Sequence, residues 1–246
     1  MENFSGKKDY KMKILALLTG RGGSKLKDKN IIKINGKPCM YYPCKASKAV
    51  KQINDFFVSS DDTKILRFGK KYGFETIKRP KKLSKTNSKH LDVLKHALQK
   101  IKEKKNFTPD IIVVLLANAP IIYSKWINEC INILKMDKNT TSVVPVYEDL
   151  DHNPLRTKKI NNGFLKNFVK NKNDISSNRQ ELPKNYFLCH NFWVIKSSAI
   201  LQNNGEQPWS FMGKKTKPYI IKKTIDIHDY SDVALAKYLV KNSKKN

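Results

Sequence analysis

Short apolar segments alternate with segments of helical character along most of the 246-residue chain. The apolar segments have the length and composition of buried strands, and they cover residues 14–18, 56–58, 74–77, 111–116 and 142–146. The intervening segments have the apolar spacing, capping residues or proline placement of helices, and they cover residues 37–50, 63–72, 90–104, 126–134 and 229–241. This alternation indicates βαβ units with parallel strands. We therefore predict a single α/β domain over residues 1–246, Rossmann-like and doubly wound around a mainly parallel sheet.

One internal segment and both ends do not fit this alternation. Segment 151–180 is less regular and rich in asparagine and lysine, and we expect it to project from the sheet as a lid or as an arm toward a partner subunit. Residues 1–10 and 242–246 are expected to be flexible. The first ten residues lack the apolar core of a secretory signal, and no apolar run approaches the roughly 20 residues that span a bilayer. The expected location is the cytoplasm, without membrane contact.

The first predicted strand runs directly into a loop rich in glycine and basic residues. The glycines allow a tight turn and bring N–H groups close to an anion, and the basic side chains add positive charge. Ligands of parallel sheets bind beyond the carboxyl ends of the strands, so the loops after Thr19, Ser59 and Ala117 should meet in one crevice. The spacing fits neither a Walker A loop nor G-x-G-x-x-G, so by spacing alone it indicates a phosphate site or a structural turn. The loop residues are Gly20, Arg21, Gly22, Gly23, Lys25 and Lys29.

The formal net charge of +28 suggests nucleic-acid binding as one possible role. Only five of the 49 basic residues are arginines, however, and the lysines are spread along the whole chain instead of forming one patch. Nucleic-acid binding is therefore an alternative and not the main expectation. The four cysteines form no C-x-x-C pair, which predicts reduced and mostly buried thiols.

Residues 21–30 read R-G-G-S-K-x-x-x-K-N, and this pattern resembles the nucleotide loop of the cytidylyltransferases that activate sialic acids and related 2-keto sugar acids. Further likenesses follow in the family's order along nearly the whole chain. V-S-S-D at 58–61 resembles the family's V-S-[ST]-D, K-R-P at 78–80 with Leu83 resembles its R-P-x-x-L, H-L-D-V-L-K-H-A at 90–97 resembles a family helix, and I-D-I at 225–227 with Asp232 resembles its I-D-I-D-x-x-x-D.

The resemblance implies a nucleotidyltransferase that couples CTP to a sialic acid-like 2-keto sugar acid. The anomeric hydroxyl attacks the α-phosphate, a CMP-sugar forms and pyrophosphate leaves, while Mg²⁺ and basic residues offset the phosphate charge. A homodimer is expected because the family is commonly dimeric. The implied catalytic residues are Arg21, Lys29 and Asp226. The candidate nucleotide-binding residues are Gly20, Arg21, Gly22, Gly23, Ser24, Lys25, Lys29, Asn30, Asp61, Arg79 and Asn118.

The sequence departs from the family pattern at three places. Asn118 stands in a loop that lacks the family's glutamine and arginine, and it either binds the nucleotide or only shapes the loop. His228 replaces one aspartate of the expected metal pair with Asp226. It binds the metal, holds a metal-bound water, contacts substrate phosphate or caps the last helix. The candidate sugar-binding residues come from a divergent region, and they are Arg156, Arg179, Gln180 and His190.

Two other functions are kept as alternatives. One is a related nucleotidyltransferase that uses another nucleotide or acceptor. The other is a non-catalytic, basic nucleic-acid-binding module on the same fold, which would bind RNA in a salt-sensitive way without releasing pyrophosphate. A Rossmann oxidoreductase is disfavoured, because no acidic residue follows the glycine loop at the required distance of about 20 residues.

Overall fold

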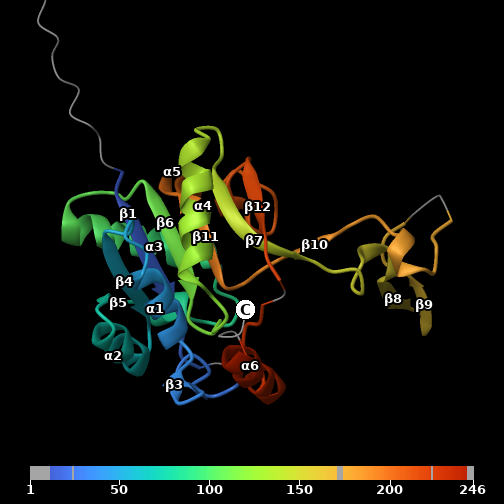
Figure 1. Ribbon diagram of the computed structural model, residues 1–246, viewed down its shortest axis with the longest axis horizontal. Coiled ribbons are helices and arrows are strands. Elements are labelled where there is room, and N and C mark those ends of the chain that lie inside the picture. Colours follow the sequence, from blue (N-terminus) through green and yellow to red (C-terminus); the bar gives the residue numbers. More distant parts are fainter. Residues whose placement is uncertain (1–11, 24, 171–173, 223, 243–246) are drawn as a thin grey trace, which may run out of the picture.

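The predicted strands all belong to one mixed sheet (Figure 1). The computed structural model describes residues 12–23, 25–170, 174–222 and 224–242, and over these residues the sheet has eight strands. Their order is β10 (Tyr186–Leu188), β7 (Ser142–Glu148), β11 (Phe192–Lys196), β6 (Ile111–Leu116), β1 (Ile14–Thr19), β4 (Asp55–Ser60) and β5 (Glu75–Lys78), with β12 (Thr216–Ile220) paired to β7.

The central strands of this sheet run parallel. Strand β1 pairs in parallel with both β4 and β6, and β4 pairs in parallel with β5. Strand β11 lies antiparallel between β6 and β7, where Trp193 is opposite Val114. The prediction of a mainly parallel, doubly wound sheet is confirmed. The reversed strand was not predicted, because its sequence does not reveal the direction in which it enters the sheet.

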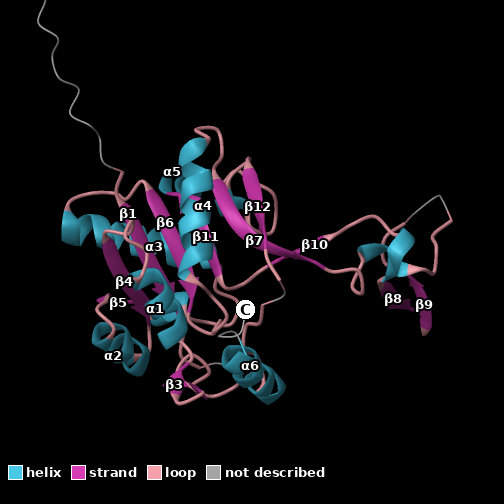
Figure 2. Ribbon diagram, viewed as in Figure 1, coloured by secondary structure: helices cyan, strands magenta, loops and turns pink. Residues whose placement is uncertain are grey.

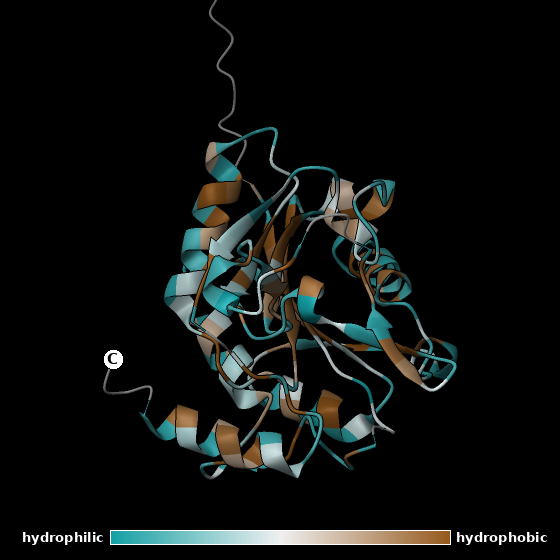
Figure 3. Ribbon diagram, turned by 90° about the vertical axis from the view of Figure 1, so that its right-hand side faces the viewer, coloured by the Kyte–Doolittle hydropathy of each residue, from teal (hydrophilic) through white to brown (hydrophobic). Residues whose placement is uncertain are grey.

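Alternate residues of β1 pack into two different cores, which explains why the whole strand is apolar. Ala16 and Leu18 face helices α1 (Tyr41–Lys48), α2 (Thr63–Lys71) and α4 (Ser124–Met136). Leu15 and Leu17 face α3 (His90–Lys105) and α5 (Ser197–Gln202) on the other side. Helices therefore cover both faces (Figure 2), and the hydrophobic residues gather in the middle layer (Figure 3). All four cysteines are buried and unpaired, as expected.

The predicted start of the first helix is wrong. Residues 37–38 form strand β3 (Lys37–Pro38), which pairs with β2 (Lys33–Ile34), and the helix begins only at Tyr41. Asn35 and Gly36, with φ angles of 46° and 80°, make the two-residue turn of a hairpin. The Asn-Gly pair was the sequence signal for this hairpin. The other predicted helices form within a few residues of their expected ends.

The C-terminal helix α6 (Tyr230–Asn242) lies beyond the carboxyl edge of the sheet. Val233 and Ala236 pack with Leu26 and Ile34 of the segment that follows the glycine loop. Asn242, predicted as part of a flexible end, is the last residue of this helix. Residues 1–10 and 243–246 lie outside the described residues. The packing of α6 brings the preceding segment 225–228 close to the glycine loop.

The segment between β7 and β10 extends away from the sheet and carries a small hairpin (Figure 1). Strands β8 (Lys158–Asn161) and β9 (Phe164–Asn167) are joined by Asn162 and Gly163, whose φ angles are 50° and 80°. At the base, the Asn153 amide donates to the Pro183 carbonyl at 2.8 Å. Single 3₁₀ turns occur at Lys81–Leu83, Pro154–Arg156, Arg179–Glu181 and Ser210–Met212. Among the described residues, no helix is both long and apolar enough to cross a membrane.

Candidate active site

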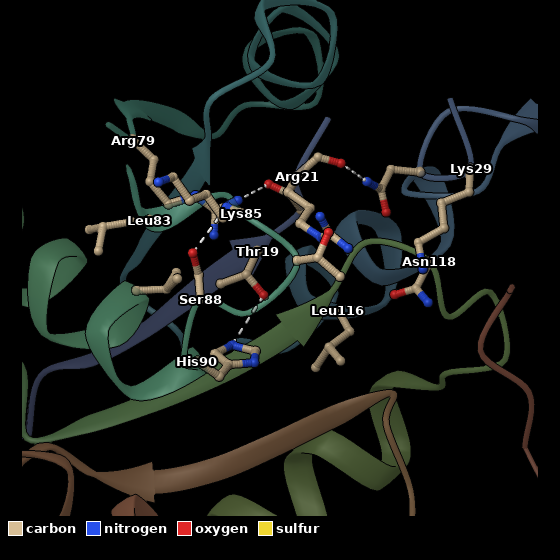
Figure 4. Close-up of a pocket in the computed structure, with 14 residues that line it drawn as sticks. Thr19, Arg21, Lys29, Arg79, Leu83, Lys85, Ser88, His90, Leu116 and Asn118 are labelled. Atoms are coloured by element: carbon tan, nitrogen blue, oxygen red, sulfur yellow. Dashed lines mark hydrogen bonds between the residues drawn. The ribbon is translucent and has the colours of Figure 1, made fainter. Parts of the chain in front are cut away.

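A pocket with a volume of about 200 Å³ opens at the carboxyl ends of the central strands (Figure 4). It lies where the loops after β1, β5 and β6 meet the first turn of α3. The Ser59 carbonyl at the end of β4 and Asp61 just after this strand accept hydrogen bonds from the glycine loop. The loops after Thr19 and Ala117 therefore meet in one crevice, as predicted, whereas the loop after β4 contacts the glycine loop from outside the pocket. The pocket is lined by Thr19, Gly20, Arg21, Lys29, Asn30, Arg79, Leu83, Lys85, Thr86, Ser88, His90, Val93, Leu116 and Asn118.

Three side chains from different parts of the chain hold the glycine loop in shape. The Gly20 carbonyl accepts a hydrogen bond from Nη2 of Arg79, and the Arg21 carbonyl accepts one from the Asn30 amide at 2.9 Å. The Gly22 N–H donates to Oδ1 of Asp61 at 3.1 Å. Each of three consecutive loop residues is thus fixed through its backbone by a side chain of the protein itself.

Close packing explains why glycine is needed at position 20. A Cβ atom there would lie 3.0 Å from Cβ of Ala117 and 3.3 Å from the Asn30 amide nitrogen. Gly23 has a φ of 62°, which a residue with a side chain adopts only with strain. The loop therefore combines a close approach of the Gly20 backbone to the side chains of Ala117 and Asn30 with a left-handed turn at Gly23.

The pocket is strongly cationic. Its lining residues include Arg21, Lys29, Arg79 and Lys85 and no aspartate or glutamate. Burial lowers the pKa of Lys29, and the nearby Asp226 opposes this shift, so the ammonium is stabilised by a carboxylate just outside the pocket. Four positive groups around one small cavity match a polyphosphate, because each anionic oxygen can find a charged donor.

Arg79 is the most buried of these cations, with 5% of its surface exposed. Burial is also the main cause that lowers the pKa of its guanidinium. Its Nε atom has no hydrogen-bond partner among the described residues. A buried donor without an acceptor is costly, so this N–H is suited to an acceptor atom on a ligand.

His90, the first residue of α3, was not predicted as a site residue. Its ring packs against Trp193 and Phe211 at centroid distances of 5.2 and 6.1 Å, and Nε2 lies 3.5 Å from Oγ1 of Thr19. Burial, and then the charge of Arg79, lower the pKa of His90 to about 4. The imidazole is therefore neutral near pH 7 and offers the pocket one donor or acceptor without charge.

Asn118 couples the loop after β6 to the segment that leads into α6. Its carbonyl accepts the Ile227 N–H at 2.9 Å, and its side-chain amide donates to the Ile227 carbonyl at 3.2 Å. Asn118 also lines the pocket. Asn118 therefore shapes the loop. Its predicted contact with the nucleotide stays a prediction.

Asp226 and His228 contact each other. Nε2 of His228 lies 2.6 Å from Oδ2 of Asp226, and the His228 N–H donates to Asp232 at 2.7 Å. Within the described part of the chain, no group of three histidine, cysteine or acidic side chains could hold a metal ion. Mg²⁺ commonly takes only one or two carboxylates together with substrate phosphates, and the carboxylate of Asp226 fits that use. His228 fits better as a partner that orients the carboxylate.

The predicted sugar-binding residues are not gathered in one place within a single chain. His190 lies near the pocket residue His90, because both rings contact Trp193. The ring of His190 lies 5.8 Å from that of Trp193 and 5.6 Å from that of Trp209. Arg156 and Arg179 lie on the segment that extends from the sheet, and Arg179 pairs with Asp151 at 2.5 Å. Gln180 is next to Arg179 in the same 3₁₀ turn. Their predicted contact with a sugar stays a prediction.

The remaining predicted loop residues lie at the edge of the pocket or outside it. Gly22 and Gly23 border a smaller hollow beside it, and Lys25 is exposed to solvent. Ser24 lies outside the described residues. Thr19, Lys85, Thr86, Ser88 and His90 also line the pocket and were not predicted. The last four lie between the end of the R-P-x-x-L motif at Leu83 and the first residue of the helix at His90, and these two motifs were the available signal.

The chain matches the family model described as "Cytidylyltransferase" over residues 15–225. It is 28% identical over 233 residues to post-translational flagellin modification protein B of Campylobacter coli, covering 93% of this chain and 95% of that protein. It is 27% identical over 232 residues to the CMP-N,N'-diacetyllegionaminic acid synthase of Campylobacter jejuni, covering 92% and 94%.

A solved structure of CMP:2-keto-3-deoxy-manno-octonic acid synthetase in complex with CTP has the same fold. It aligns with a TM-score of 0.70 over 94% of this chain and 99% of that chain, at 14% sequence identity. At that identity the likeness concerns the fold alone, and it agrees with the Rossmann-like sheet described above.

Proposed function

The chain belongs to the cytidylyltransferase family of nucleotidyltransferases, and from this premise we propose that it couples CTP to a 2-keto sugar acid, giving a CMP-sugar and pyrophosphate. The observation that carries the proposal is the cationic pocket beyond the parallel strands, lined by Arg21, Lys29, Arg79 and Lys85 without an acidic residue. Such a lining suits a triphosphate whose charge must be offset during transfer.

In the proposed reaction, the hydroxyl oxygen of the sugar acid bonds to the α-phosphorus of CTP. The bond from that phosphorus to the bridging oxygen breaks, pyrophosphate leaves and the hydroxyl proton is released. Arg21 and Lys29 hold the phosphates from the glycine-loop side, while Lys85 acts from the opposite wall. The free Nε–H of Arg79 donates to an acceptor atom of the nucleotide.

We propose Mg²⁺ as the divalent cation, with Asp226 as its protein ligand. When bound beside the phosphates, the ion supplies positive charge that the cations of the pocket alone do not provide. His228 holds the carboxylate of Asp226 through the 2.6 Å contact. Asp226 also interacts electrostatically with the ammonium of Lys29, a lining residue of the cationic pocket. The carboxylate therefore lies close to the proposed phosphate site.

The arm formed by β8 and β9 supports a homodimer. Its strands are exposed on both faces, and Ile160, Phe164, Leu165 and Phe168 are each more than 60% exposed. A two-stranded hairpin with apolar side chains and no core beneath it is marginally stable alone and favours a partner surface. We propose a second copy of the chain as that partner.

The test is a pyrophosphate-release assay with Mg²⁺ and a panel of 2-keto sugar acids. N,N'-diacetyllegionaminic acid, which names the C. jejuni relative, is tested first, together with sialic acid. We expect release with CTP and much less with UTP, GTP or ATP. Preference for another nucleotide, or salt-sensitive RNA binding without pyrophosphate release, would support one of the alternative functions.

A further inference from the structure

Asp61 touches the pocket wall from outside the pocket. Its Oδ1 atom accepts the hydrogen bond from the Gly22 N–H at 3.1 Å, and the same oxygen lies 3.9 Å from Nη2 of Arg79. Asp61 is absent from the lining residues. A single carboxylate oxygen therefore contacts two separate parts of the wall, the glycine loop and the arginine that follows β5.

Asp61 supplies a negative charge beside the buried guanidinium of Arg79. Arg79 is buried, and a buried cation is stable only with a counter-charge and hydrogen bonds. Asp61 is the carboxylate that opposes the effect of burial on the Arg79 pKa, and its own side chain is only 20% exposed. The backbone N–H of Arg79 donates to the carbonyl of Ser60 at 2.8 Å, which places Arg79 beside the residue that precedes Asp61.

These contacts clamp residue 21 on both sides. Arg79 holds the carbonyl of Gly20, and Asp61 holds the N–H of Gly22. Arg21 lies between these two fixed points, and its side chain enters the pocket. Because Asp61 contacts both the loop and Arg79, it sets the spacing between the two.

We propose that Asp61 is a positioning residue that presets the glycine loop and Arg21 for the triphosphate before CTP binds, without contacting the nucleotide. The inference rests on the proposed function of this pocket as the CTP site. A loop that already has its bound shape does not lose freedom on binding, so more of the contact energy appears as affinity. The resemblance to the family implies a nucleotide contact for Asp61, whereas the geometry points to support from behind.

The decisive measurement is hydrogen exchange at the Gly22 amide in the free protein, followed by NMR. We expect Asp61→Ala to speed this exchange about tenfold, the factor that a hydrogen bond to a charged group typically contributes. The same variant should raise KM for CTP about tenfold or more and lower kcat less, because the loop must then be ordered during binding. Asp61→Asn keeps an acceptor oxygen for the Gly22 N–H but loses the counter-charge of Arg79, so it should restore the slow exchange and only part of the affinity.

Asp55→Ala is the matched control. Asp55 lies at the other end of β4, is similarly exposed and pairs with Lys105 at 3.5 Å, far from the loop. Its removal should change neither Gly22 exchange nor KM for CTP. If Asp61→Ala does not fold, Asp61→Ser replaces it, because it removes the carboxylate and keeps a small polar side chain, and unchanged Gly22 exchange in that variant overturns the proposal.

Three results overturn the inference: unchanged Gly22 exchange in a folded Asp61→Ala protein, faster exchange with unchanged KM, or a folded Asp61→Asn variant as impaired as Asp61→Ala. Failure of the proposed function can be told apart from failure of this inference. A wild-type protein that does not turn over CTP refutes the function, while the exchange measurement still shows whether Asp61 holds the loop.

Discussion

The imidazole of His228 binds the carboxylate of Asp226, with Nε2 and Oδ2 2.6 Å apart. The two side chains meet although neither residue lies in a strand. The imidazole therefore fixes the direction of the carboxylate. This support of Asp226 was not among the roles expected for His228, and the contact favours it over direct binding of a hard cation.

Asp226→Asn should reduce turnover at least about a hundredfold at ordinary Mg²⁺ concentrations, because an amide keeps the shape but loses the charge that binds the ion. The rate is measured as a function of Mg²⁺ concentration. Asp229→Asn is the control, since the Asp229 carboxylate accepts the Asp232 N–H at the start of α6 and an amide oxygen can accept the same bond. Unchanged Mg²⁺ dependence in Asp226→Asn would remove Asp226 from the metal site.

His228→Asp should keep Mg²⁺-dependent turnover and lower the Mg²⁺ concentration needed for half-maximal rate, because a second carboxylate is added beside the first. The same titration series measures it, together with KM for CTP. A large rise in that KM with no change in the Mg²⁺ requirement would instead show that His228 donates to a substrate phosphate.

Arg21→Ala should cut CTP turnover at least about a hundredfold, because it removes a charged donor from a pocket that partly excludes water. Lys29→Ala should act similarly, and exposed Lys25→Ala less strongly. Steady-state pyrophosphate release measures all three. Arg67→Ala removes an exposed arginine from α2 and should leave the rate unchanged. Normal rates in both Arg21→Ala and Lys29→Ala would exclude the loop as the nucleotide site.

His90 should make the fold less stable as the pH falls from about 6.5 to about 4. Its pKa is lowered to about 4 in the folded protein from an ordinary value of 6.5, so between these values the unfolded chain binds the proton more readily. The free energy of unfolding is expected to fall by on the order of 3 kcal/mol between these two pH values. Urea unfolding at several pH values measures it, and His90→Gln should flatten the slope. An identical slope in both proteins would contradict the prediction.

Charged residues on the arm should disrupt the proposed homodimer. Phe164→Asp together with Leu165→Asp puts two carboxylates on a hairpin that exposes its apolar side chains. Light scattering should show a shift from dimer to monomer, while the melting temperature of the main domain changes little. Lys159→Asp on the same hairpin changes charge without removing apolar surface and serves as the control. A wild-type monomer at working concentration would contradict the dimer itself.

The local parts of this fold could be predicted from the sequence, since β1, its glycine loop and the helices depend on patterns within a few residues. The first helix was predicted to start too early, at Lys37 instead of Tyr41, because the Asn35-Gly36 turn places Lys37 and Pro38 in a hairpin. The antiparallel entry of β11 depends on pairing with Val114 and its neighbours, far away in the sequence, and no local pattern records it.

The candidate site was predictable where a motif carried the chemistry, as for Arg21, Lys29 and Arg79. His90 was missed because a histidine at a helix start has no spacing that marks it as a pocket residue. The position of Asp61 behind the loop was also beyond the sequence, because the direction of a side chain just after a strand depends on how that strand ends. In both cases the direction of the side chain decides whether it reaches the pocket, and the residue type alone does not determine that direction.

The insertion of β11 beside β6 has a consequence for synthesis on the ribosome. Strands β1, β4, β5 and β6 are complete once Leu116 has been made, but one edge of β6 stays open until the chain reaches Lys196. During the several seconds of translation between these points, the nascent chain exposes an unpaired strand of isoleucine, valine and leucine. Trp193, which packs against His90, also arrives only then. The aromatic packing around His90 therefore forms late, and the half-formed sheet with its open β6 edge is the stage at which the nascent chain is most prone to aggregation.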